Sequence, residues 1–260
     1  MIELSTLQIF LDDYLFFQKE MDITVIDPHM ANGLMVKGKE AVKKVGFGVS
    51  ASLSLFTKAK EANCDALVVH HSFNLPHYNY YDSLYQNRIA YLLTYGISLF
   101  GYHFLLDAHP VVGNNAQILT TIGARPVRPF TFKGNPWGWV GEFGETVAWA
   151  KVTEALKPFL SERMIEYACG QKMVKRIVAI SGMGTPYPNH MQALVNEHID
   201  GYITGEAHEW VRELFCEASI NFLAGGHYAT EVFGVKAVME KIKKEFSQLE
   251  VEFIDLPNQV

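Results

Sequence analysis

Cysteines, long apolar runs and basic residues are all scarce in this sequence, and each scarcity excludes a class of protein. The three cysteines form no CxxC pair or dense framework, which favours a reducing compartment over a secreted, disulfide-stabilised domain. No apolar run reaches the roughly 18–20 residues of a membrane span, and the N-terminal residues lack the basic start of a signal peptide. The formal net charge of −6 gives no global attraction to nucleic acid. We therefore expect a cytoplasmic protein that uses neither a membrane nor a nucleic acid as partner.

The remaining composition is that of an ordinary globular protein. The chain has 260 residues, of which 49% are hydrophobic and 19% charged, enough for one large domain or two closely packed ones. Folding at this size should bury roughly 70–75% of the surface of the unfolded chain, so the core needs no disulfides. We expect Cys64, Cys169 and Cys216 to be small buried hydrophobic residues.

Short β-rich runs alternate with helical patterns along the chain, which is typical of βαβ units and predicts an α/β fold. In the first half we expect strands at 42–50, 65–71 and 96–103, separated by helices at 52–64 and 83–96. The second of these helices ends in a glycine, as helix C-termini often do.

The second half repeats the element order of the first. Its strand-like runs VKRIVAISG, DGYITGE and ASINFLAGG follow one another as VKKVGFGVS, DALVVHH and GISLFGYH do before them. A Pro/Gly-rich stretch at 124–139 is the best candidate boundary. We therefore predict a duplicated three-layer βαβ-type unit with two pseudo-symmetric halves, 1–126 and 127–260, related by a pseudo-twofold axis.

Each third strand ends in a histidine that is followed four residues later by a carboxylate. Four residues are one helical turn, so each pair would lie on one helix face with Cβ atoms about 5–6 Å apart, a workable spacing for a metal ion. A further pair of adjacent histidines ends the second strand, where α/β sheets bind ligands. The candidate metal ligands are His70, His71, His103, Asp107, His227 and Glu231.

Nitrogen and carboxylate ligands without thiolate favour Zn, Fe, Mn, Co or Ni. Five or six of them exceed the needs of one tetrahedral zinc and would fit two divalent ions about 3.5–4 Å apart. A single HxxxE is commonly a hydrogen-bonded surface pair; three histidine-bearing strand ends in one chain favour metal binding. Because a pseudo-twofold axis would bring equivalent strand ends together, we expect the halves to share one metal cleft.

The other histidines have no comparable spacing, and we expect them to be ordinary surface or core hydrogen-bonding residues: His29, His77, His109, His190, His198 and His208. His208 is the least secure of these, because TGEAHEW follows a strand end that would face the same cleft. The SGMG turn at 181–184 lacks GxGxxG or GK[ST] and is more typical of a tight turn than of an anion site.

Five motifs, NGLMV, DALVVHH, HFLLD, ITGE and GGHYATE, occur in this order and span nearly the whole chain. In identity, order and approximate spacing they resemble the NIF-three-like family of dinuclear-metal proteins, some of whose bacterial members are labelled GTP cyclohydrolase I type 2 homologues. The resemblance implies a duplicated α/β unit, two metal ions and a homo-oligomer in the form of a ring-shaped hexamer. At this length the chain resembles the short members that lack an inserted middle domain.

Carried over residue by residue, the resemblance implies metal binding by the paired histidines, the aspartate of HFLLD, and the histidine and glutamate of GGHYATE, with His103 as a further candidate. Two departures from the family pattern stand out. The usual small polar residues between histidine and aspartate are here Phe104, Leu105 and Leu106, and AHPVVGNN replaces the usual alanine-proline-glycine-glycine run. The ligands remain, but a substrate pocket shared with the family is not implied.

The metal ligands allow more than one function. Two ions can lower the pKa of bound water to about 7 and clamp attacking and leaving oxygens, so a hydrolase of phosphate, amide or purine-ring bonds in an unknown small molecule is chemically reasonable. In that hypothesis Glu231 or Asp107 bridges the ions, and Glu206 or His208 is the general base. The cyclohydrolase label would also require a triphosphate pocket, and no basic cluster plainly supplies one. The alternatives are a non-catalytic protein for metal delivery, storage or regulation, and ions that act as structural pins.

Overall fold

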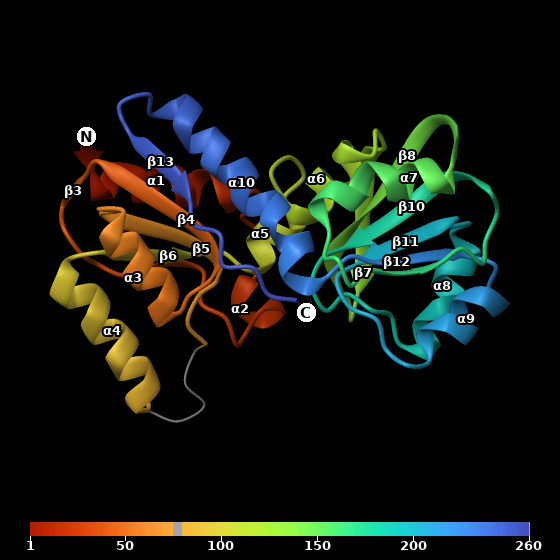
Figure 1. The fold of residues 1–260 in the computed structure, drawn as a ribbon, viewed down its shortest axis with the longest axis horizontal. Coiled ribbons are helices and arrows are strands. Elements are labelled where there is room, and N and C mark those ends of the chain that lie inside the picture. The colour runs from red at the N-terminus through yellow and green to blue at the C-terminus, as the bar shows by residue number, and fades with distance from the viewer. Residues whose placement is uncertain (75–79, 260) are drawn as a thin grey trace. The chain divides into compact units, whose positions relative to one another are not determined.

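The structure is a computed structural model that describes residues 1–74 and 80–259, and these form two compact units (Figure 1). The first unit comprises Met1–Leu106 and Val235–Leu256; the second comprises Asp107–Gly234 and the residues from Pro257 onward. His77, expected to be an ordinary histidine, lies outside the described residues.

A five-stranded sheet forms the centre of the first unit, in the order β13-β4-β5-β6-β2. The first four of these strands are parallel, and β2 is antiparallel to β6. Their bounds are β2 Gly33–Val36, β4 Lys44–Ser50, β5 Ala66–His71, β6 Ser98–Gly101 and β13 Glu250–Phe253. A separate antiparallel pair joins β1 (Ile2–Glu3) to β3 (Ala41–Val42).

Helices cover both faces of this sheet (Figure 1). On one face, α3 (Leu53–Glu61) and α4 (Ser83–Tyr95) bury Phe56 and Leu92 against strand residues such as Leu99. The helix α4 ends, as predicted, at Gly96, whose φ of 65° is the left-handed conformation that glycine adopts without strain. On the other face lie α1 (Leu4–Leu15) and the part of α10 that belongs to this unit (Figure 1). A single turn, α2 (Ile23–Ile26), precedes β2.

A six-stranded sheet forms the centre of the second unit, in the order β7-β8-β10-β11-β12-β9. The adjacent strands β10, β11 and β12 are parallel, and the others are antiparallel to their neighbours. Their bounds are β7 Arg125–Phe132, β8 Asn135–Ala148, β9 Ile165–Tyr167, β10 Met173–Ile180, β11 Gly201–Thr204 and β12 Asn221–Ala224.

Successive residues of β10 enter opposite cores, as the period of two in a strand requires. Ile177 packs in a core with α6 and α7, whereas Val178 packs in a core with α8 and α9. The unit therefore has three layers, and the chain is an α/β protein as predicted. The bounds of the helical elements are α5 Phe104–Ala108, α6 Asn114–Thr121, α7 Trp149–Leu156, η1 Lys157–Phe159, η2 Pro188–His190, α8 Met191–Asn196, α9 Val211–Glu217 and α10 His227–Glu245.

The repeated order of strands and helices is confirmed. The elements β4-α3-β5-α4-β6 of the first unit correspond to β10-α8-β11-α9-β12 of the second, and each set gives three adjacent parallel strands. One hydrogen bond also recurs in both sets: an aspartate just before the second strand accepts the backbone N–H of a residue in the first strand. In the first unit Lys44 donates to Asp65 (3.3 Å), and in the second unit Arg176 donates to Asp200 (2.8 Å).

The register of the repeats can be followed to the candidate ligands. Tyr102 and Gly225 make the equivalent backbone hydrogen bond to the neighbouring parallel strand. His103 therefore corresponds to Gly226, one residue before His227. The two histidine-carboxylate runs occupy the same turn of the repeat, offset by a single position.

The division of the chain differs from the predicted halves. Most of the stretch 124–139 forms the hairpin of β7 and β8. Two of its three prolines, Pro126 and Pro129, lie in the edge strand β7, where a missing N–H is tolerated. The first unit instead ends at Leu106, and the C-terminal residues return to it because β13 pairs with β4.

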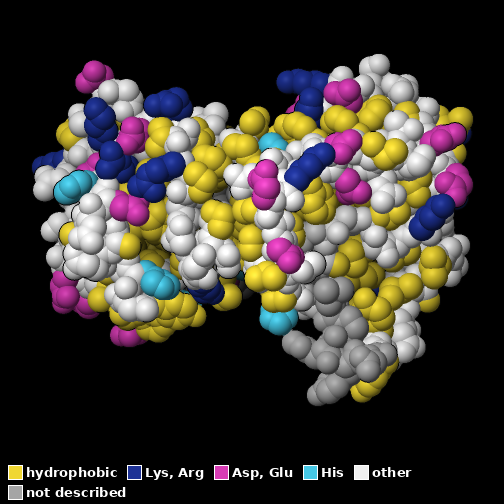
Figure 2. Space-filling view, turned by 180° about the vertical axis from the view of Figure 1, so that it is seen from behind, with side chains coloured by type: hydrophobic (Ala, Val, Ile, Leu, Met, Phe, Trp, Pro, Cys, Tyr) yellow, Lys and Arg dark blue, Asp and Glu magenta, His cyan; other side chains and the backbone are white. Residues whose placement is uncertain are grey.

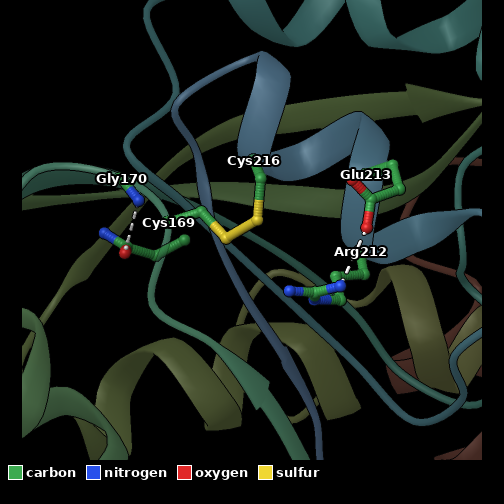
Figure 3. The surroundings of a disulfide bond; sticks show 6 residues. Cys169, Gly170, Arg212, Glu213 and Cys216 are labelled. Carbon is green, nitrogen blue, oxygen red and sulfur yellow. Dashed lines mark hydrogen bonds and ion pairs between the residues drawn. A yellow bond between two sulfur atoms is a disulfide. The ribbon is translucent and has the colours of Figure 1, made fainter.

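The prediction of three small buried cysteines is correct only for Cys64, whose side chain is 4% exposed and whose thiol pKa is raised by burial to about 11. Cys169 and Cys216 are half-buried and form a disulfide between the residues after β9 and the last turn of α9 (Figure 3). The two cysteines are 47 residues apart, so no local spacing pattern could pair them.

No helix in the described parts of the chain is long and apolar enough to cross a membrane. On the face seen in Figure 2, acidic and basic side chains are mixed rather than sorted by sign.

Candidate metal centre

Three histidines come together in the first unit at the carboxyl ends of β5 and β6. The ring centroids of His70 and His71 are 4.6 Å apart, and the ring of His103 lies 5.0 and 5.4 Å from them. Each offers one nitrogen, and these atoms lie within 4.8 Å of one another, a grouping that could hold a metal ion. The strand ends therefore bring together the three predicted ligands of this unit, as expected for ligand sites of α/β sheets.

Oxygen partners orient these imidazoles. His70 Nδ1 donates to the carbonyl oxygen of Tyr102 (3.0 Å), and His71 Nδ1 is hydrogen-bonded to Ser50 Oγ (3.1 Å). With Nδ1 engaged, Nε2 is the nitrogen suited to a metal, which is the usual arrangement of metal-binding histidines. His70 is fully buried, so its ring orientation is fixed by packing as well.

His103 is held by a carboxylate and an amide that the sequence did not single out as functional. Its Nδ1 donates to Asp27 Oδ2 (2.8 Å), and its backbone N–H donates to Asn32 Oδ1 (2.9 Å). Asn32 Nδ2 in turn donates to Asp27 Oδ2 (3.4 Å). Burial would raise the pKa of Asp27, but the hydrogen bond and charge of His103, with the N–H of Phe104 and Asn32, lower it overall. These contacts give the asparagine of NGLMV a structural role.

In the second unit, α10 begins at His227 and places it one turn before Glu231. The two side chains lie on one face, as predicted, with His227 Nε2 2.9 Å from Glu231 Oε1. Glu231 is 2% exposed. The other ring nitrogen, Nδ1, donates to Glu206 Oε1, so this imidazole too is oriented by a carboxylate.

The electrostatics of His227 follow from its two acidic neighbours. Burial alone would lower the pKa of its imidazole, but the hydrogen bond and charge of Glu231, followed by those of Glu206, raise it to about 9. Without a metal, the imidazole is therefore a cation shared by two carboxylates. A divalent cation at Nε2 would take the place of that proton and satisfy the same negative charge.

The SGMG turn forms part of the wall beside this pair. Gly182 has a φ of 58°, and a Cβ at this position would collide with Glu231 Oε1 and lie 3.1 Å from His227 Nε2. Its N–H donates to Thr230 Oγ1 (3.0 Å), so the turn is hydrogen-bonded to α10. Only glycine allows the backbone to approach the pair this closely.

Asp107, the predicted ligand of α5, is 7% exposed and lies in a buried polar network of the second unit. Its Oδ1 accepts hydrogen bonds from Asn114 Nδ2 (2.9 Å) and Ser181 Oγ (2.7 Å). The side chain of Asn115 also links these two residues: it donates to the carbonyl oxygen of Asp107 (3.1 Å) and accepts the backbone N–H of Ser181 (2.6 Å).

Comparisons with known proteins agree with the motifs. The model of the family described as Duf34/NIF3 (NGG1p interacting factor 3) matches residues 13–259. The chain is 36% identical over 253 residues to a protein of Archaeoglobus fulgidus named "GTP cyclohydrolase 1 type 2 homolog", covering 95% of this chain and 96% of that one. A protein of Escherichia coli strain K12 with the same name is 31% identical over 251 residues, covering 92% and 95%.

This chain belongs to the Duf34/NIF3 family. Solved structures show the same fold: the protein ybgI, described as of unknown function, has a TM-score of 0.84 at 30% identity, with both chains covered completely. A protein of Thermus thermophilus has a TM-score of 0.81 at 29% identity, again over the full length of both.

Within this Duf34/NIF3 protein, the predicted catalytic residues occupy different positions. Glu206 contacts His227, where it orients a candidate ligand. His208 stacks on Trp210, with ring centroids 4.6 Å apart and an angle of 24° between the planes. His109 fits the ordinary interpretation, because its Nδ1 accepts backbone N–H groups at the following turn.

The structure explains some of the residues that depart from the family pattern between His103 and Asn115. Phe104, Leu105 and Leu106 are almost fully buried, so the apolar run between histidine and aspartate belongs to the core. Of the AHPVVGNN run, the two asparagines are fully buried and contact Asp107. Sequence reasoning missed them, although adjacent asparagines shortly after a predicted ligand were an available signal.

Proposed function

We propose that the chain is a dinuclear divalent-metal protein whose ions are held by His70, His71, Asp107, His227 and Glu231, with His103 as a further ligand. The observation that carries the proposal is the common orientation of its histidines: in each, Nδ1 is hydrogen-bonded to an oxygen, which makes Nε2 the nitrogen suited to a metal. A buried glutamate beside the Nε2 of His227 adds the carboxylate that such a centre needs.

The activity that this donor set supports best is metal-dependent hydrolysis. Two ions held by nitrogen and carboxylate ligands supply an activated water and charge stabilisation at the attacked bond. The chain's own part is to orient the ligands: Glu206 fixes the imidazole of His227, and Asp27 fixes that of His103. With Glu206 engaged in this way, His208 is the remaining candidate for proton transfer.

The relatives' name suggests the first substrate to test. Proteins named "GTP cyclohydrolase 1 type 2 homolog" match nearly the whole chain, so GTP belongs at the head of a panel of nucleotides and phosphoesters. We include in the proposal a homohexameric assembly in the cytoplasm, which light scattering on purified protein and fractionation of cells would test.

The experiment begins with metal. The protein is stripped with a chelator, reloaded separately with Zn, Mn, Fe(II), Co or Ni, and analysed for metal per chain before the substrate panel is assayed. We expect about two ions per chain and turnover that disappears with chelator. A matched pair of variants is His227→Asn and His198→Asn, because His198 is an exposed histidine whose φ of 52° suits asparagine.

The outcomes separate the two classes of function. Loss of metal in His227→Asn but not in His198→Asn, with turnover in the wild type, supports the hydrolase. Tight, exchangeable metal without turnover on any substrate favours a metal-delivery or regulatory protein instead. Wild-type protein that binds no metal from any of the five salts would refute the proposal.

A further inference from the structure

The GNN run, Gly113 to Asn115, differs from the family pattern at the same place in the sequence. In the second unit, both of its asparagines contact the proposed metal ligand Asp107. Asn114 is fully buried, and its side chain makes two hydrogen bonds. Its Nδ2 donates to Asp107 Oδ1 (2.9 Å), and its Oδ1 accepts the backbone N–H of Gly234 (2.7 Å). One amide therefore joins a proposed ligand to the helix α10, whose first turn carries two others.

The surrounding backbone is shaped to admit this side chain. A Cβ on Gly234 would lie 2.6 Å from Asn114 Oδ1 and 2.9 Å from its backbone nitrogen, closer than real contacts allow. A Cβ on Gly113 would lie 2.9 Å from the carbonyl oxygen of Asp107. Gly234 is thus required for the side chain of Asn114 to fit against α10, and Gly113 allows the preceding backbone to pass close to that of Asp107.

We infer that Asn114 is a positioning residue that sets the carboxylate of Asp107 relative to the ligands on α10. The inference deepens the proposed function and rests on it. The physical reason is that a buried carboxylate with two donors on one oxygen has little freedom to rotate, and groups that orient metal ligands typically contribute about 10–100-fold to metal affinity. Asn114 and Ser181 are those two donors.

The choice of asparagine follows from the two contacts. An aspartate here would keep the acceptor for Gly234 but would replace the donor with a second carboxylate against Asp107. A leucine would fill the space and satisfy neither group. Only a primary amide of this length donates to one partner and accepts from the other.

The test compares Asn114→Ala with Asn221→Ala as a matched control. Asn221 is also buried in this unit (1% exposed) and also bonds through both amide atoms, but its partners are backbone groups of Gly170, Gln171 and Asp200. Affinity for Co(II) and Zn(II) is measured by competition with a chromophoric chelator, alongside metal per chain and the circular dichroism spectrum.

We expect Asn114→Ala to bind at least one ion about 10–100-fold more weakly, while Asn221→Ala stays within a few-fold of wild type. Gly234→Ala should reproduce the loss while leaving Asn114 in the sequence, and it replaces Asn114→Ala if that variant does not fold. Equal affinity in wild type and both of these variants would overturn the inference and leave the proposed function intact. The same loss in Asn221→Ala would also overturn it, because the effect would then be general destabilisation. A wild type that binds no metal would overturn both.

Discussion

Replacing Glu231 by glutamine changes the charge at the centre while nearly preserving the shape of the side chain. Glu231 Oε1 lies 2.9 Å from His227 Nε2, and the carboxylate is almost completely buried. The imidazole also donates to Glu206. We predict that Glu231→Gln lowers the stability of the metal-free protein, and that the loss depends on pH.

The magnitude follows from the pKa of His227, which these neighbours raise from 6.5 to about 9 against the opposing effect of burial. The difference corresponds to roughly 3 kcal/mol in favour of the protonated form, at 1.36 kcal/mol per pKa unit. Because the pKa is raised in the folded state, this contribution is fully present below about pH 6.5 and is lost as pH rises through about 9. Since Glu231 is the larger favourable contributor, we expect Glu231→Gln to cost about 1–3 kcal/mol at pH 6 and markedly less at pH 10.

The assay is urea unfolding of chelator-treated wild type and variant at both pH values. Other groups that titrate between pH 6 and 10 do so in both proteins, so they largely cancel in the difference. An equal loss of stability at both pH values would mean that His227 is not a cation held by two carboxylates. After reloading with metal, the variant should also contain fewer ions per chain than wild type, with an unchanged far-ultraviolet dichroism spectrum.

Three further predictions follow from other contacts. Asp27→Asn, which weakens the support of His103 Nδ1, should reduce metal affinity by about 10–100-fold; unchanged affinity in a titration would remove His103 from the centre. Reduction should lower the free energy of unfolding by up to about 4 kcal/mol, the chain-entropy value for a loop of 47 residues, and a variant with serine at both Cys169 and Cys216 should show no response to reductant. Metal binding at pH 7.5 should release the proton of His227, so calorimetric heats should vary with the ionisation heat of the buffer; heats independent of the buffer would contradict this assignment.

Short sequence patterns predicted those features of the structure that depend on interactions between residues close together in the sequence. The strands and crossover helices follow from the alternation of apolar periodicities, and Gly96 marked the end of α4. The pairing of His227 with Glu231 followed from one helical turn. These features depend on neighbours within a few residues, so the sequence was sufficient.

Features that depend on distant contacts were not predicted. The contact of Asp27 with His103 joins residues 76 apart, and the contact of Asn114 with Gly234 joins residues 120 apart. Neither pair has a local spacing that would reveal it. The pairing of β13 with β4 likewise joins distant residues, such as Glu250 and Lys44, and returns the end of the chain to the first unit.

The most direct test of the dinuclear centre is anomalous X-ray diffraction from crystals of the cobalt- or zinc-loaded protein. We predict two anomalous peaks per chain about 3.5–4 Å apart, within bonding distance of His70 or His71, of Asp107, and of both His227 and Glu231. Peaks that lie only on exposed histidines, or a fully loaded crystal in which none of these residues contacts an ion, would contradict it.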